Sequence, residues 1–136
     1  MPLVKGEAQV LQIRTSSDVV TVRQAVRTVA ASLGFTLVDQ TKVVTAASEL
    51  ARNTLEHGGG GQARIEALEE GIRKGVRMVF EDKGPGISDI KLALTDGYTT
   101  GTGMGLGLSG SKRLVSEFDI WSQAGQGTRI TATKWK

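Results

Sequence analysis

The chain of 136 residues contains no cysteine and only one histidine. Disulfide bonds and thiolate metal sites are therefore excluded, and a zinc site is disfavoured, because zinc is bound mainly by Cys and His. No apolar run approaches the length of about 20 residues that spans a bilayer, and the N-terminus lacks a basic segment followed by an apolar one. We therefore expect no membrane association and no signal peptide, and the lack of cysteine is consistent with a cytoplasmic protein.

Aromatic residues are also scarce, at 4% of the chain, and the net charge is only +3, with the basic residues scattered. Clusters of basic and aromatic residues typical of nucleic-acid binding are absent, so we expect no nucleic-acid partner. The length predicts a single domain, residues 1–136, that buries its own core. Glycine is abundant instead: many of the 18 glycines fall in residues 57–61 and 97–110.

Apolar periodicity predicts three helices and a shorter fourth. The first covers Val19–Leu33, with Ser17 or Asp18 as its N-cap and Gly34 just past its end. The second covers Asp39–Glu56, and its apolar side consists of Val43, Ala46, Ala47, Leu50 and Thr54. A short helix within Ser88–Leu94 and a third full helix over Gly107–Phe118 follow.

Alternation of apolar and polar residues predicts five strands. Glu7–Arg14 is the first, and Ala63–Ala67 and Val76–Phe80 form a hairpin. Two closing strands are predicted at Ile120–Gln123 and Thr128–Thr133. Hairpin-paired strands with helices between them predict an α+β fold, a two-layer α/β sandwich whose mixed, mostly antiparallel sheet carries helices on one face.

Glu49 and Asn53 are four residues apart in the second predicted helix, so they project together from its surface, about 6 Å apart along the axis. We place them on the face opposite the apolar side. An amide oxygen is a suitable ligand for Mg²⁺ that keeps most of its waters, and a carboxylate one turn away can deprotonate a nucleophile. An ordinary solvated helix face would show the same pair, so the spacing alone does not establish a site.

The segment Asp82-Lys83-Gly84-Pro85-Gly86 follows a predicted apolar strand. A carboxylate at a strand end can accept a hydrogen bond from an exocyclic amine such as that of adenine, and the glycines allow the main chain to approach a flat ring. A tight Pro-Gly turn is the alternative explanation.

Glycine alternates with other residues from Gly101 to Gly107, immediately before the third full helix. Such a segment exposes several N–H groups to one anion, and the helix N-terminus adds the positive end of its dipole, so we predict phosphate binding here. The spacing Gly105-x-Gly107-x-x-Gly110 matches the dinucleotide fingerprint only formally, because no apolar strand precedes it and no acidic residue follows about twenty residues later. The Ser-Lys pair after Gly110 is in the wrong order for a P-loop.

These three elements, in this order, resemble the Bergerat-type ATP sites of the GHKL superfamily, which includes histidine kinases and gyrase-type ATPases. Glu49 and Asn53 match the N box. The two glycine boxes are matched by Asp82, Gly84 and Gly86 and by Gly103, Gly105 and Gly107, and Gly127-Thr128 resembles the late Gly-Thr element.

A closer resemblance, to the RsbT-type serine/threonine kinases of the bacterial stressosome, covers nearly the whole chain. It rests on Ser48–Asn53, Glu81–Ile87, Asp96–Tyr98, Lys112–Leu114 and Ala132–Trp135. These kinases, related to anti-sigma-factor kinases, phosphorylate STAS-domain scaffold proteins and then activate a PP2C-type phosphatase. The resemblance therefore implies both classes of partner, ATP and Mg²⁺ as cofactors, and a role in stress signalling. The short span between the two glycine boxes favours a small kinase whose protein partner closes the site.

The resemblance also implies a role for each matching residue. Asn53 would bind Mg²⁺ and the nucleotide, Glu49 would be the general base for the acceptor hydroxyl, and Asp82 would bind the adenine amine. The other residues expected at the nucleotide are Gly84, Gly86, Ile87, Gly101, Thr102, Gly103, Met104, Gly105, Leu106, Gly107 and Thr128. A cation is also expected at the γ-phosphate, and both Arg52 and Lys91 are candidates.

Several alternatives stay open. The run Gly58–Gly61 is either a wide turn, which we favour, or a flexible loop beside the nucleotide. His57 shares the face of Asn53; it either contacts a phosphate or, as we favour, is a helix-terminal histidine stabilised by the helix dipole. In place of a kinase, the chain could be a non-catalytic, ATP-responsive, anti-sigma-like binding module. A detached histidine-kinase catalytic domain is a third option, against which the segment Asp96–Tyr98 argues.

Overall fold

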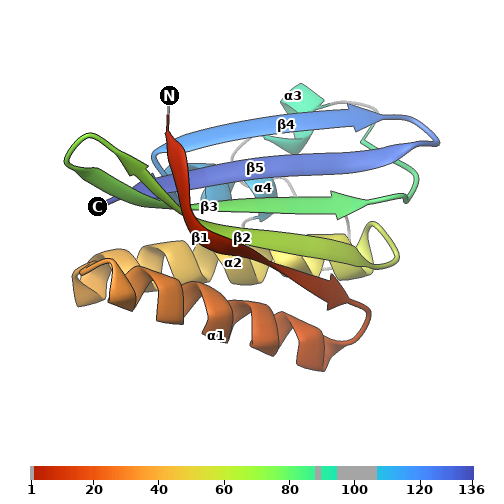
Figure 1. Cartoon of the computed structure of the whole chain (residues 1–136). Coiled ribbons are helices and arrows are strands. Elements are labelled where there is room, and N and C mark those ends of the chain that lie inside the picture. The colour runs from red at the N-terminus through yellow and green to blue at the C-terminus, as the bar shows by residue number, and fades with distance from the viewer. Residues whose placement is uncertain (1, 88–89, 95–106) are drawn as a thin grey trace.

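The computed structural model describes residues 2–87, 90–94 and 107–136, and the structural statements below concern these residues. The elements are β1 (Leu3–Ile13), α1 (Ser16–Ser32), α2 (Leu37–Glu56), β2 (Gly61–Glu70), β3 (Arg73–Asp82), α3 (Ile90–Ala93), α4 (Gly107–Leu114), β4 (Glu117–Gln123) and β5 (Gly127–Trp135). The strands form one sheet in the order β1-β2-β3-β5-β4, and its four pairings are all antiparallel. The helices lie on one face of the sheet (Figure 1). This arrangement confirms the predicted two-layer α+β sandwich.

The core lies between the sheet and the helices. Alternate residues of β2 and β3 point into it, among them Ile65, Val76, Met78 and Phe80, each at most 1% exposed. Those strands pair directly, so the predicted hairpin is confirmed. The predicted apolar side of α2 is confirmed too, because all five of its residues are buried.

Leu50 provides a test of this core, because its side chain is fully buried on α2. Leu50→Ala is expected to lower the free energy of unfolding by about 2–5 kcal/mol, since it removes apolar burial and leaves a cavity. Val20→Ala is the matched control, because Val20 is 49% exposed on α1; it should cost less than about 1 kcal/mol. Urea denaturation measures both, and equal losses would contradict the assignment of the core.

The N-terminus of α1 differs from the prediction. Thr15, rather than Ser17 or Asp18, is the N-cap, and Asp18 is the third helical residue of a capping box. The Asp18 carboxylate accepts the main-chain N–H groups of Arg14 at 2.8 Å and of Thr15 at 3.0 Å. These two hydrogen bonds lower the pKa of Asp18. Ser17 and Asp18 both favour helix ends, so composition alone does not fix which residue caps the helix.

The helix predicted over Gly107–Phe118 ends earlier, at Leu114. The main-chain N–H of Ser116 already donates to the carbonyl of Thr133 at 2.8 Å, so the chain has joined the sheet there. Phe118 belongs to β4, pairs with Ala132 and packs against the core. An apolar residue at helical spacing is thus explained equally well by the period of a strand, which is why the boundary was misplaced.

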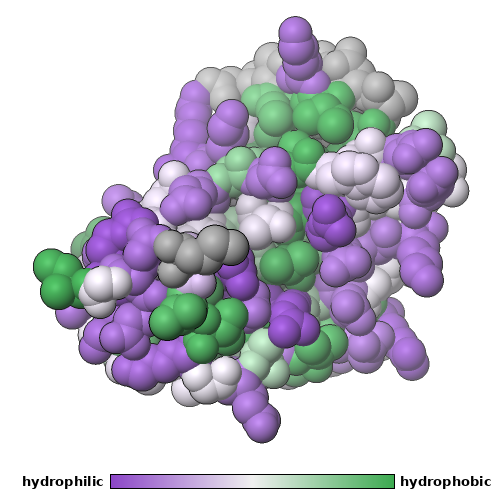
Figure 2. Space-filling model, turned by 45° about the horizontal axis from the view of Figure 1, so that its top comes forward, coloured by the Kyte–Doolittle hydropathy of each residue, from purple (hydrophilic) through white to green (hydrophobic). Residues whose placement is uncertain are grey.

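The other face of the sheet is open. Figure 2 views the molecule from this side and shows hydrophilic residues over most of it, with hydrophobic ones between them. Glu66 is nevertheless only 4% exposed there. Its carboxylate accepts the Nε–H of Arg77 at 2.8 Å and lies 3.3 Å from Nε of Arg64. The hydrogen bond from Arg77 is the main reason that the pKa of Glu66 is lowered, against the opposing effect of burial.

Because the pKa of Glu66 is lowered in the folded state, its ion pairs stabilise the protein above the ordinary pKa of 4.5. That contribution is lost as the pH falls through the lower pKa of the folded state. Glu66→Gln is therefore expected to make the acid side of the stability profile shallower. Denaturant titrations from pH 7 down to pH 3 measure the effect, with Glu7→Gln, an exposed residue of β1, as the control. An unchanged profile in Glu66→Gln would contradict this account.

Candidate functional site

One face of α2 carries Glu49, Asn53 and His57 at intervals of four residues, the first two partly buried. His57 caps the C-terminus of α2, and its Nε2 lies 3.3 Å from the carbonyl oxygen of Gly86. With a rise of about 1.5 Å per residue, Asn53 lies about 6 Å and Glu49 about 12 Å along the axis from His57. The segment after β3 therefore meets α2 at the end of the line that these side chains form.

Asp82 is the last residue of β3 and lies beside Thr128, its partner in β5. The Oδ1 atom of Asp82 accepts the N–H of Gly84 at 2.9 Å. Thr128 Oγ1 is 2.9 Å from Oγ of Ser122, which also accepts the N–H of Ile87 at 2.7 Å. The structure therefore brings the predicted residues Asp82, Gly84, Ile87 and Thr128 together at one end of the central strands β3 and β5.

Ser122 is a residue of this cluster that the sequence analysis missed. It joins Ile87 to β5, because its hydroxyl also donates to the carbonyl of Gly127 at 3.0 Å. Its place opposite Thr128 in the register of β4 and β5 could have indicated it. That register was not available from the residue pattern alone.

The glycines of this region allow three segments to approach closely. A Cβ on Gly84 would lie 2.7 Å from Cα of Gly58, and one on Gly127 would lie 2.1 Å from the carbonyl oxygen of Asp82. A Cβ on Gly86 would lie 2.4 Å from the carbonyl oxygen of Gln123. Side chains at these positions would separate the α2–β2 turn, the segment after β3 and the β4–β5 hairpin.

The run Gly58–Gly61 is the turn between α2 and β2, as the favoured explanation predicted. Gly58 N–H donates to the carbonyl of Asn53 at 3.2 Å, and Gly60 N–H donates to that of Thr54 at 2.9 Å. The turn also contributes to the site, because a Cβ on Gly58 would lie 2.3 Å from the carboxyl carbon of Asp82. Gly58 is thus the residue that leaves room for that carboxylate.

Gly58→Ala is expected to displace the Asp82 side chain and so to weaken ATP binding about tenfold. Residue 58 would act through Asp82 and would not itself contact the nucleotide. Gly71→Ala, in the distant β2–β3 turn where φ is +62°, controls for loss of a surface glycine, because a Cβ there would meet no described residue within 4 Å apart from its chain neighbours. Calorimetric titration with ATP measures the effect, and wild-type affinity in Gly58→Ala would contradict the role given to this contact.

Glu49 is engaged with a neighbouring cation. Nη1 of Arg52 lies 3.1 Å from Oε1 of Glu49, and Nη2 of Arg52 is 3.4 Å from Oγ of Ser48. The Glu49 side chain is 21% exposed and that of Arg52 is 37% exposed. Arg52 is therefore directed along α2 toward the carboxylate, whereas the side-chain amide of Asn53 makes no hydrogen bond within the described part of the chain.

The structure describes only some of the remaining predicted site residues. Gly101, Thr102, Gly103, Met104, Gly105 and Leu106 lie outside the described residues. Gly107 is the first residue of α4, which contacts α2. Lys91 lies in the short helix α3. None of the helices that the structure describes is long and apolar enough to cross a membrane.

Comparison with known proteins agrees with this geometry. Residues 38–136 match the family described as histidine kinase-, DNA gyrase B- and HSP90-like ATPase, and the chain belongs to this family. The chain is 48% identical to the serine/threonine-protein kinase RsbT of Bacillus subtilis over 125 residues. These aligned residues make up 92% of this chain and 94% of that relative. The predicted resemblance to RsbT-type kinases is thereby confirmed: the chain is a protein serine/threonine kinase that uses ATP.

One further relative and one solved structure are also similar to the chain. The anti-sigma F factor of Clostridium novyi is 33% identical over 119 residues, which is 82% of each chain. The crystal structure of the RsbU and RsbW domains of Rv1364c from Mycobacterium tuberculosis matches with a TM-score of 0.66 and 23% identity, over 96% of this chain and 33% of that one. At that identity the structural match supports the fold alone.

Proposed function

We propose that this kinase transfers the γ-phosphoryl group of ATP to a Ser or Thr of a STAS-domain scaffold protein. It would then bind and activate a PP2C-type phosphatase in a bacterial stress-signalling pathway. The similarity to the serine/threonine-protein kinase RsbT supports this proposal most directly. We further propose that residues 1–136 act as one domain, in the cytoplasm, without nucleic-acid or membrane partners.

The face of α2 supports a division of roles between Glu49 and Asn53. In the proposed reaction the hydroxyl oxygen of the acceptor Ser or Thr bonds to the γ-phosphorus, and the bond between that phosphorus and the bridging oxygen of ADP breaks. Glu49 accepts the proton that the hydroxyl loses. Arg52 holds the Glu49 carboxylate from one side at 3.1 Å. Arg52 and Lys91 both stay candidates for the cation at the γ-phosphate.

The nucleotide would lie between that face of α2 and the end of β3, where Asp82 is the last residue. Asp82 would accept a hydrogen bond from the adenine amine, with Thr128 beside it and Gly84, Gly86 and Ile87 along the ring. Phosphates would be bound by the segment from Gly101 to Gly107 at the start of α4: Gly101, Thr102, Gly103, Met104, Gly105, Leu106 and Gly107.

Asn53 fits a role in binding Mg²⁺, because its side-chain amide has no partner within the described residues. No cluster of three His, Cys, Asp or Glu side chains that could hold a metal occurs in the described part of the chain. Phosphate oxygens and water would therefore complete the coordination shell, as is usual for Mg²⁺. The ion would neutralise charge on the phosphates when bound.

The proposal is tested by incubating the kinase with ATP labelled at the γ-phosphate, Mg²⁺ and a STAS-domain protein from the same genome. We expect acid-stable label on a single Ser or Thr, mapped by mass spectrometry. Acid-labile label would indicate a histidine-kinase domain instead, and no transfer to any STAS-domain protein of that genome would overturn the proposed substrate class.

A second candidate function is an ATP-responsive binding module, which the 33% identity to an anti-sigma F factor favours. In that case ATP would change the affinity for a partner without phosphoryl transfer. Asn53→Ala separates the two. Partner binding that survives this substitution, with no phosphate transfer by the wild-type protein, would favour the binding module.

A further inference from the structure

One transverse row of the open sheet face differs from the rows beside it. The register of the four strand pairings places Gln12, Gln62, Glu81, Arg129 and Trp121 directly next to one another across all five strands. The row contains two carboxamides, a carboxylate, a guanidinium and an indole, and no aliphatic side chain. Trp121 is 43% exposed at its far end, on β4.

The side chains of this row are not paired with one another. Gln12, Gln62 and Glu81 make no hydrogen bond or ion pair to any described residue, and Arg129 only lies over the ring of Trp121, 5.9 Å from its centroid. By contrast, Glu66, which lies further along the same face, is paired with both Arg77 and Arg64. A ligand that binds to the hydrogen-bonding groups of the first row would therefore replace water there, and not another side chain of the described residues.

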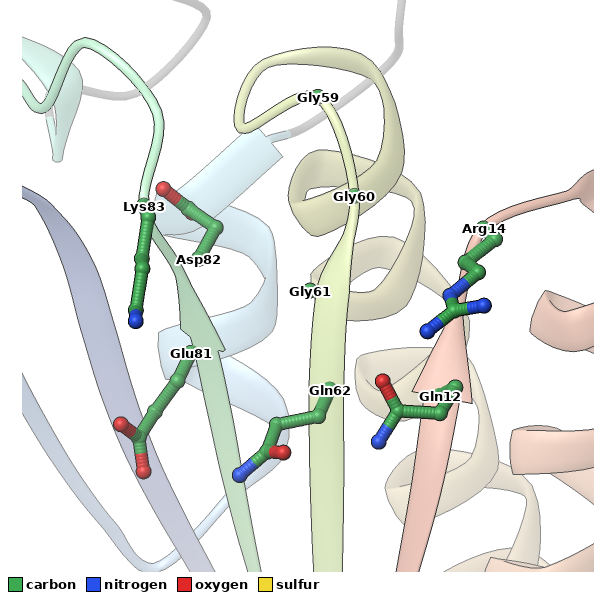
Figure 3. Close-up of a pocket in the computed structure, with 9 residues that line it drawn as sticks. All are labelled: Gln12, Arg14, Gly59, Gly60, Gly61, Gln62, Glu81, Asp82 and Lys83. Carbon is green, nitrogen blue, oxygen red and sulfur yellow. The ribbon is translucent and has the colours of Figure 1, made fainter.

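A pocket of about 660 Å³ lies at the β1 end of this row. Figure 3 shows Gln12, Gln62 and Glu81 side by side on neighbouring strands, with Arg14 and Lys83 on opposite sides of the hollow. Gly59, Gly60 and Gly61 also line it, and they present only main chain to the pocket. A Cβ on Gly61 would lie 2.0 Å from the carbonyl oxygen of Glu81, so this position tolerates no side chain.

The charge of the surface selects an acidic ligand. Arg14, Lys83 and Arg129 are cations, and none of them has an ion-pair partner within the described residues. Two carboxylates, Glu81 and Asp82, also line the pocket, and that of Asp82 already accepts the N–H of Gly84. The three cations therefore outnumber the carboxylates of the row and pocket by one. Carboxamides, which donate and accept together, complement the alternating C=O and N–H groups of a main chain.

We propose that this row and its pocket bind an extended, acidic peptide segment of a protein partner. The segment runs across the five strands, from Arg14 and Lys83 at the pocket to the ring of Trp121. Four strand spacings of about 4.8 Å give a path of about 19 Å, which an extended peptide covers in about six residues. The row lies on the face of the sheet opposite to α2, whereas the pocket is also lined by Asp82 and so borders the proposed nucleotide site.

The test measures peptide binding without nucleotide, so its outcome does not depend on the roles proposed for Glu49 and Asn53. Three fluorescein-labelled libraries of eight-residue peptides are compared by anisotropy at about 50 mM salt, where surface charges are weakly screened. Glu, Lys or Gln is fixed at alternate positions, and the other positions are randomised. We expect the Glu library to bind at least about tenfold more tightly than the Lys library.

Paired variants locate the binding. Arg14→Gln with Lys83→Gln should weaken binding of the Glu library at least about fivefold, whereas Arg23→Gln with Arg27→Gln, which removes the same charge from exposed positions of α1, should not. Trp121→Ala should also weaken it. Equal binding of the three libraries, no binding of the Glu library, or equal weakening by the α1 pair would overturn the proposal. Wild-type affinity in Trp121→Ala would overturn the path across the sheet.

Discussion

Glu49→Gln is expected to lower the rate of phosphoryl transfer by about 10²–10⁴-fold, the usual contribution of a general base. The amide still accepts a hydrogen bond from Arg52, which lies 3.1 Å from the carboxylate, but it cannot take the proton of the acceptor hydroxyl. ATP affinity should therefore stay within about threefold of the wild-type value. Single-turnover transfer to a saturating STAS-domain substrate measures the rate, and calorimetry measures the affinity.

Glu56→Gln is the matched control, because Glu56 is an exposed glutamate in the last turn of the same helix. Its rate of transfer should equal that of the wild type. If Glu49→Gln also transfers phosphate at the wild-type rate, Glu49 is not the base. If it loses ATP affinity and rate together, Glu49 acts in nucleotide binding instead.

Asp82→Asn is the second change with a large expected effect. The carboxylate is proposed to accept a hydrogen bond from the adenine amine, and a hydrogen bond to a charged group contributes about 1.5–3 kcal/mol. ATP affinity should therefore fall by about 10- to 150-fold. We also expect the wild type to prefer ATP to GTP and Asp82→Asn to lose much of this preference, because the carboxylate is the group proposed to recognise the amine.

Glu81→Gln controls for the loss of one carboxylate beside the site. Glu81 precedes Asp82 in β3 and so points to the other face of the sheet. Its ATP affinity should match that of the wild type. A loss in Glu81→Gln as large as that in Asp82→Asn would show that net charge, rather than contact with adenine, determines binding.

Much of this architecture follows from the period of the apolar residues. The buried side of α2 and the hairpin of β2 and β3 were predicted correctly, because burial on one face imposes a helical period on Val43–Thr54 and an alternating one on Ala63–Ala67. The N box and the first glycine box were found from spacing and order. How the two segments approach each other is a tertiary property: Nε2 of His57, one helical turn after Asn53, lies 3.3 Å from the carbonyl oxygen of Gly86.

The features that sequence reasoning missed depend on contacts between segments that are distant in the chain. The place of Ser122 beside Ile87 requires the register of β4, and the contact of Gly58 with Asp82 requires the packing of a turn against a strand end. The Glu49–Arg52 pair is local, but the sequence analysis considered Arg52 only as a candidate cation for the γ-phosphate. Helix ends were misplaced where a residue such as Phe118 fits both a helical and a strand period.

The central claim is that Asn53 and Asp82 face one nucleotide with its magnesium ion. Calorimetric titration of the wild type and of Asn53→Ala with ATP, each in Mg²⁺ and in EDTA, tests it directly. We predict that Mg²⁺ strengthens ATP binding to the wild type and that Asn53→Ala loses most of this strengthening. No uptake of ATP by the wild type, or an undiminished effect of Mg²⁺ in Asn53→Ala, would contradict the account.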